Sequence, residues 1–171
     1  TDAYGIEITF YEWPVAEAKA IVQLAHGLGE HARRYDHVAA ALNRAGYSVY
    51  ADDHRGHGVT GANQRARGEI KQQGNLGKGG MTATIAQVHQ LTELISEENP
   101  ATPIFLIGHS WGSMLAQRII KDHASDYTGV VLSGSTLMLP GVVPSAGFNK
   151  KWDKLPDSTG KEWLSRDRRS E

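Results

Sequence analysis

Residues 104–113 read Ile-Phe-Leu-Ile-Gly-His-Ser-Trp-Gly-Ser, and they are the most informative part of the sequence about both fold and chemistry. The apolar run at 104–107 predicts a strand, and the periodic apolar side chains from 111 to 122 predict a helix. Between them, Gly108 to Gly112 match the pattern G-x-S-x-G, in which a serine occupies a sharp strand-to-helix turn. Such a turn would lift the hydroxyl group of Ser110 above the sheet, where it can act as a nucleophile.

The rest of the sequence repeats this alternation of apolar strands and amphipathic helices. The expected strands are 6–13, 20–25, 48–52, 104–108 and 129–133, and the expected helices are 35–45, 81–97 and 111–122. The glycine-rich stretch 53–80 is expected to be a long loop. The alternation predicts an α/β fold, with a mostly parallel sheet and helices on both faces. The functional loops of such a fold lie at the carboxyl ends of the strands.

The composition is that of an ordinary globular domain. The chain has 171 residues, 40% of them hydrophobic and 22% charged, which fits a single domain. A net charge of −1 gives no electrostatic reason to expect a nucleic-acid partner. The sequence contains no Cys, which excludes disulfides, thiolate metal sites and cysteine nucleophiles and fits a cytoplasmic protein. No apolar run is long enough for a spanning helix, so stable membrane insertion is not expected.

A second loop bears on the same chemistry. His26-Gly27-Leu28-Gly29 directly follows the expected buried strand 20–25. Acyl transfer needs two backbone N–H groups beside the nucleophile, to bind the negatively charged oxygen of the intermediate. One comes from the residue after the nucleophile and the other from a loop after an earlier strand. By this rule the candidate donors are Trp111 and Leu28.

Five segments of the sequence are typical of one enzyme family: LAHGLGEHARRY (24–35), YADDHRGHG (50–58), IFLIGHSWGS (104–113), GVVLSGS (129–135) and WLSRD (163–167). With these segments, the chain resembles the α/β-hydrolase serine esterases, most closely the monoacylglycerol lipase and lysophospholipase-like group. The resemblance implies that Ser110 is the nucleophile and that Leu28 and Trp111 form the oxyanion hole. It implies small lipid esters as substrates, such as monoacylglycerol or lysophospholipid, with no cofactor or metal ion. The Asp53–Gly58 segment is expected to be structural.

The sequence departs from this family after Ser110. In the family, a lid, the triad acid and the triad histidine follow the nucleophile in that order. Here the only later histidine, His123, would lie about 20 Å along the expected helix, too far for a general base. We therefore expect the triad acid and histidine to be absent from this chain and to belong to a missing C-terminal half of the same protein. Residues 1–134 would form the N-terminal part of an incomplete hydrolase core, residues 135–171 would begin the lid, and the chain alone would be a poor catalyst.

Several alternatives stay open on the sequence alone. Residues 27–32 fit the dinucleotide-binding pattern G-x-G-x-x-A through Gly27 and Gly29, and Asp52 ends the next strand. A hydrolase-like fold can also be a non-catalytic binding or scaffold protein. The earlier histidines at 26, 54 and 57 lie in loops at the active end of the sheet, with Asp52 or Asp53 as the only obvious orienting carboxylate. The spacing of His54 and His57 is too short for a helical zinc motif, so no metal site is expected there.

Overall fold

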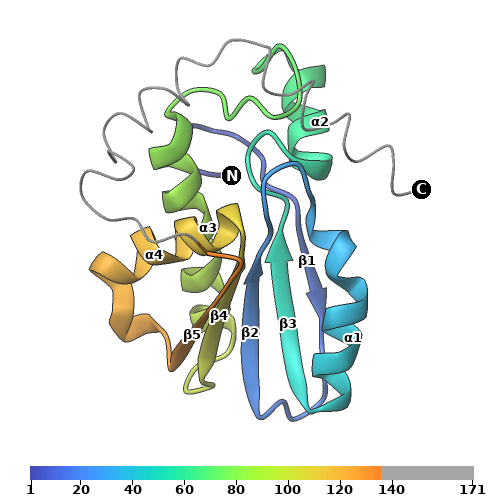
Figure 1. Cartoon of the computed structure of the whole chain (residues 1–171), viewed down its shortest axis with the longest axis vertical. Coiled ribbons are helices and arrows are strands. Elements are labelled where there is room, and N and C mark those ends of the chain that lie inside the picture. Colours follow the sequence, from blue (N-terminus) through green and yellow to red (C-terminus); the bar gives the residue numbers. More distant parts are fainter. Residues whose placement is uncertain (136–171) are drawn as a thin grey trace.

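The computed structural model describes residues 1–135, which form a five-stranded sheet. Its strands are β1 (Phe10–Trp13), β2 (Ala20–Ala25), β3 (Tyr47–Asp52), β4 (Ile104–His109) and β5 (Gly129–Ser133). They lie in the order β1-β3-β2-β4-β5, and only the β1–β3 pair is antiparallel. Helices cover both faces of this mostly parallel sheet (Figure 1), which confirms the predicted α/β class.

Alternating side chains of the buried strand β2 serve two separate cores. The helices are α1 (Asp36–Arg44), α2 (Gly58–Ala66), α3 (Gly80–Glu98) and α4 (Trp111–His123), with short 3-10 turns η1 (Ala32–Tyr35) and η2 (Ala124–Asp126). Val22 and Leu24 belong to the core on the α1 side of the sheet. Ile21 and Ala25 belong to the larger core under α3 and α4. Every residue of β2 is buried, because apolar layers cover the strand from both sides.

The structure corrects the expected loop at 53–80, because α2 lies within it. Glycines in this segment suggested a loop, yet two of them are required by close packing. A Cβ atom at Gly61, inside α2, would lie 2.4 Å from the carbonyl carbon of Gly56. At Gly56 it would lie 2.5 Å from the carbonyl oxygen of Asn75. The first strand is also shorter than expected, since the residues before Phe10 form no regular element.

The sheet ends on one side at β5. Within residues 1–135, no strand pairs with the outer edge of β5, and Val131 and Leu132 are 51% and 40% exposed. Among the described helices, none combines the length and the apolar character needed to cross a bilayer. The expected lid lies outside the described residues from residue 136 onward.

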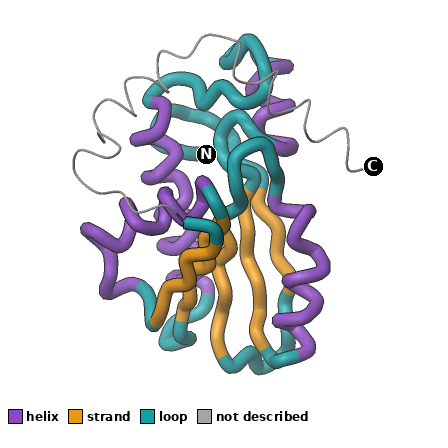
Figure 2. Tube along the Cα trace, viewed as in Figure 1, coloured by secondary structure: helices purple, strands orange, loops and turns teal. Residues whose placement is uncertain are grey.

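The loops that carry the candidate site gather at one end of the sheet. β2, β3 and β4 are parallel, so their carboxyl ends lie together (Figure 2). The loops after these strands begin at His26, Asp53 and Ser110. The fold therefore brings together the three segments that the sequence singled out.

Candidate active site

Ser110 has a backbone conformation that few residues other than glycine adopt. Its φ is 51° and its ψ is −116°, directly between the end of β4 and the start of α4. Hydrogen bonds hold it on both sides: its N–H donates to the carbonyl of Ser133 at 2.8 Å, and its carbonyl accepts the Ser113 hydroxyl at 2.6 Å. Strain of this kind costs about 1–3 kcal/mol and persists only where the surrounding structure enforces it.

Two flanking glycines allow the strand and the helix to meet at this angle. A Cβ atom at Gly108 would lie 2.6 Å from the carbonyl oxygen of Gly112. At Gly112 it would lie 2.1 Å from the carbonyl oxygen of Ala25, so the first turn of α4 packs directly on the end of β2. Ser110 itself is exposed, and its Oγ atom has no hydrogen-bond partner within residues 1–135. The hydroxyl is therefore presented to solvent at the carboxyl end of the sheet.

The loop after β2 lies against this serine. A Cβ atom at Gly27 would be 3.3 Å from the Cβ atom of Ser110. The next residue is Leu28, and the residue after the serine is Trp111, the first residue of α4. Neither the Leu28 N–H nor the Trp111 N–H has a hydrogen-bond partner in the part of the chain that the structure describes. Two backbone N–H groups without partners thus belong to the two segments next to an exposed hydroxyl, and N–H groups placed in this way can bind a developing oxyanion.

Glu30 holds this loop in shape. Its Oε2 atom accepts the Gly27 N–H at 3.0 Å and the Tyr35 hydroxyl at 2.7 Å. Burial and this hydrogen bond to a carboxylate raise the pKa of Tyr35. Sequence reasoning treated Glu30 only as part of a glycine-rich loop. A carboxylate bound to the Gly27 N–H also disfavours dinucleotide binding, because it occupies an amide that a pyrophosphate would need.

Both ring nitrogens of His26 make hydrogen bonds to the protein backbone. Its Nδ1 atom lies 2.7 Å from the Gly27 carbonyl and donates to it, while its Nε2 atom accepts the His54 N–H at 3.0 Å. These partners fix the neutral tautomer with the proton on Nδ1. Complete burial lowers the pKa of His26 well below its usual value, and the neighbouring His54 and His57 lower it further. His26 therefore braces the loop and has no free nitrogen for base catalysis.

A buried carboxylate–imidazole pair lies beside Trp111. The His54 Nδ1 atom is 2.6 Å from Asp52 Oδ2, and Gln87 on α3 donates to the same oxygen at 2.7 Å. The His54 ring meets the Trp111 ring edge-on, with centroids 5.6 Å apart. Sequence analysis did not find Gln87, which lies on a different element from this pair. The Ser110 hydroxyl makes no hydrogen bond to this pair.

The rest of the Asp53–Gly58 segment makes hydrogen bonds to neighbouring parts of the fold, which fits the structural role expected for it. The two carboxylate oxygens of Asp53 accept the Ala32 N–H at 2.8 Å and the Val59 N–H at 2.7 Å. The His57 Nδ1 atom lies 2.9 Å from the Arg55 carbonyl, and burial lowers the pKa of His57 to about 4. The segment thus joins the loop after β2 to α2.

His123 lies at the far end of α4, the helix that starts at the sharp turn at Ser110, which we call the elbow. The helix α4 is unbroken from Trp111 to His123, so the two ends are about 18 Å apart at a rise of ~1.5 Å per residue. This distance excludes His123 as a base for Ser110. No histidine among the described residues makes a hydrogen bond to the Ser110 hydroxyl. The described part of the chain thus brings a candidate nucleophile and two amides together, without a base.

Comparison with known proteins identifies one protein family. The family described as "Serine aminopeptidase, S33" matches residues 16–169. A monoacylglycerol lipase of Mycolicibacterium smegmatis is 31% identical over 131 residues, which are 76% of this chain and 43% of that protein. The aligned part of the chain therefore spans less than half the length of this curated relative.

Solved structures agree with the sequence match. A thermostable carboxyl esterase from Bacillus coagulans, solved in complex with glycerol, is 33% identical with a TM-score of 0.71, over 80% of this chain and 43% of that one. A monoacylglycerol lipase from Paleococcus ferrophilus is 28% identical with a TM-score of 0.62, over 88% of this chain and 52% of that one. These matches confirm the predicted resemblance to α/β-hydrolases of the monoacylglycerol lipase type.

Proposed function

The chain belongs to the serine aminopeptidase S33 family of α/β-hydrolases, and we propose that it carries the nucleophilic part of an ester-hydrolysing site centred on Ser110. The observation that carries the proposal is the φ of 51° at Ser110, in a G-x-S-x-G turn between β4 and α4. A strained, exposed serine beside two free amides suits covalent acyl transfer.

In the proposed reaction, Ser110 Oγ loses its proton to a base and forms a bond to the ester carbonyl carbon. The carbonyl oxygen becomes negatively charged and is bound by the N–H groups of Leu28 and Trp111. Collapse of this intermediate breaks the ester C–O bond and releases the alcohol, which takes up the proton. Water then hydrolyses the acyl group from Ser110. Loss of one oxyanion donor costs about 10²–10³-fold in rate in such sites.

We propose that the base and its orienting acid come from outside residues 1–135. His26 has both nitrogens engaged, and His123 is about 18 Å away. The exposed apolar side chains Val131 and Leu132 on β5 suit a position inside a wider sheet. A C-terminal half of the same protein would pack against this edge and complete the triad. Residues 135–171 would begin the lid over the site.

The proposed substrates are small lipid esters of the monoacylglycerol or lysophospholipid class. Support comes from the relatives, which are named as monoacylglycerol lipases. The apolar run at 137–144, which the sequence places at the start of the proposed lid, has a composition compatible with an acyl chain. The proposed compartment is the cytoplasm.

The test compares Ser110→Ala with wild type in the complete natural protein, measured as fatty-acid release from a monoacylglycerol. We expect a rate loss of at least about 10³-fold with unchanged folding. Ser96→Ala, which changes an exposed serine on α3, serves as the matched control and should keep full activity. Retention of most activity by Ser110→Ala would contradict the nucleophile assignment. A wild-type protein that neither hydrolyses esters nor reacts with a fluorophosphonate would favour a non-catalytic scaffold.

A further inference from the structure

Two histidines and an aspartate meet on the flank of the molecule, far from Ser110. His89 lies in the middle of α3, His123 ends α4, and Asp126 lies in η2. One ligand atom from each of these side chains lies within 4.8 Å of the others. The His89 and His123 rings are stacked, with centroids 3.7 Å apart. Two imidazoles and a carboxylate from three different elements thus lie close together, and the stacked rings would have to tilt for both nitrogens to face one ion.

The separations of these atoms fit the coordination shell of a small divalent cation. Asp126 Oδ2 lies 2.8 Å from His89 Nε2 and 3.8 Å from His123 Nδ1. Ligands about 2.0–2.1 Å from a tetrahedral zinc ion are about 3.3 Å from one another. Shifts of about half an ångström would bring Asp126 to that spacing from each histidine, and the two imidazole nitrogens, which lie within 4.8 Å of each other, would have to move closer together. A hydrogen bond between His89 and Asp126 occupies the same place, and binding would replace its proton by the cation.

A second carboxylate stands on the other side of the His89 ring. Glu93 Oε1 lies 3.8 Å from His89 Nδ1, one helical turn further along α3. Histidines that bind metals usually direct their second nitrogen at a carboxylate or carbonyl, which fixes the tautomer and leaves the other nitrogen free to ligate. His89 is itself only 9% exposed, so its ring has little freedom to turn away. At 3.8 Å the two atoms are not hydrogen-bonded, so Glu93 would have to move closer to orient His89 in this way.

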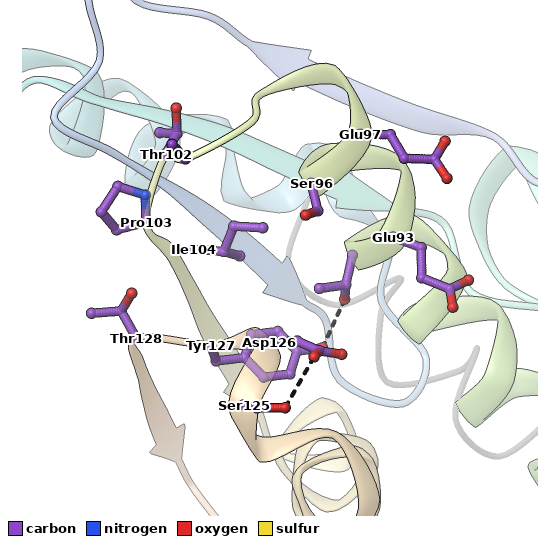
Figure 3. A pocket seen from close by; sticks show the side chains of 12 residues that line it. Glu93, Ser96, Glu97, Thr102, Pro103, Ile104, Ser125, Asp126, Tyr127 and Thr128 are labelled. Carbon is purple, nitrogen blue, oxygen red and sulfur yellow. Dashed lines mark hydrogen bonds between the residues drawn. The ribbon is translucent and has the colours of Figure 1, made fainter.

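We propose that His89, His123 and Asp126 form a binding site for a divalent transition-metal ion of the zinc class. Two imidazole nitrogens and one carboxylate oxygen suit zinc, whereas magnesium and calcium prefer ligand sets made of oxygen. Figure 3 shows a pocket between α3 and the η2 turn that is lined by Glu93 and Asp126 but not by His89 or His123, so the proposed site shares only Asp126 with it. The exposure of His123 and Asp126 leaves the remaining coordination positions to water.

The proposed role of this site is to join two helices, separately from catalysis. A bound ion would connect the middle of α3 to the end of α4, whose other end carries Ser110. About 18 Å of helix separates His123 from the elbow, so the ion could not polarise a substrate at Ser110. Such a link should stabilise the folded protein in proportion to metal concentration.

The test measures metal binding to the full chain by isothermal titration calorimetry with Zn²⁺ and by visible absorption with Co²⁺. Wild type should bind one Zn²⁺ at this site, and Co²⁺ should give the strong visible bands of a tetrahedral complex. His123→Ala and Asp126→Asn should each weaken binding at least about tenfold. Both side chains are exposed, although each also contacts His89, Asp126 by a hydrogen bond and His123 by stacking. His37→Ala, which removes an exposed histidine on α1, is the matched control and should leave binding unchanged.

The proposal also predicts that Zn²⁺ raises the melting temperature of wild type and of His37→Ala, but not of the two ligand variants. The proposal would be overturned if His123→Ala bound Zn²⁺ as tightly as wild type does. It would also be overturned if His37→Ala lost as much Zn²⁺ affinity as His123→Ala. Far-UV circular dichroism checks that each variant is folded. If His123→Ala were to unfold, Asp126→Asn would decide the question alone.

Discussion

Replacement of Ser110 by glycine should make the protein more stable than replacement by alanine. Both variants remove the hydroxyl, whose loss costs no hydrogen bond within residues 1–135. They differ in the Cβ atom, which is unfavourable at a φ of 51° and a ψ of −116°. Relief of this strain is worth about 1–3 kcal/mol. Glycine also gives the unfolded chain more conformational freedom, which lowers the free energy of unfolding of Ser110→Gly by about 0.4–1 kcal/mol relative to Ser110→Ala.

We therefore expect the free energy of unfolding of Ser110→Gly to exceed that of Ser110→Ala by about 1 kcal/mol. For a chain of this size, that difference raises the melting temperature by about 2–4 °C. Urea unfolding, followed by tryptophan fluorescence and circular dichroism, measures the free energy, and calorimetry measures the melting temperature. At an unstrained position alanine is the more stable of the two, so the predicted order is reversed from the ordinary one. Ser110→Ala that is more stable than Ser110→Gly would refute the strained-elbow argument.

Two other predictions concern the structure around the elbow. Gly112→Ala should lower the free energy of unfolding by about 3 kcal/mol, because its Cβ atom would lie 2.1 Å from the Ala25 carbonyl oxygen. Gly68→Ala is the control. No atom lies within 4 Å of a Cβ atom there, and the φ of 73° alone should lower the free energy of unfolding by only about 1 kcal/mol. The free energy of unfolding should also decrease as the pH falls, because the pKa of His57 is about 4 in the folded state and 6.5 ordinarily. The unfolded chain therefore binds more protons between these pH values, and about 2 kcal/mol should be lost between pH 7 and pH 5. His57→Gln should reduce this pH dependence in urea unfolding; an unchanged slope would mean that the ring is not held neutral.

The regular elements could be predicted where apolar periodicity is strong. β2 and β4 are mostly apolar segments, and α3 and α4 carry long apolar stripes, so their positions follow from the sequence almost to the residue. The helix α2 could not be found in this way, because Gly58 and Gly61 lower helix propensity locally. Both glycines are needed by tertiary contacts that the sequence does not reveal, such as the side chain of Asp53 against Gly58.

In the candidate site, too, some residues could be predicted from sequence motifs and others could not. The elbow at Ser110 and the loop at Leu28 were predictable, because local motifs at strand ends mark them. Gln87 and Glu30 were not, since their roles arise from side-chain contacts rather than from a motif. The proposed metal site has only a weak signal in sequence: His123 and Asp126 stand three residues apart, while His89 comes from another helix. The assignment of Ser110, Leu28 and Trp111 to catalysis stays a prediction.

The most direct test of the proposed chemistry is a crystal structure of the complete natural protein after reaction with an alkyl phosphonate ester. The proposal predicts a covalent bond from phosphorus to Ser110 Oγ. It also predicts that the phosphonyl oxygen, which stands in for the oxyanion, lies about 2.7–3.1 Å from the backbone nitrogens of Leu28 and Trp111. An adduct on another residue, or a phosphonyl oxygen directed away from both amides, would contradict it.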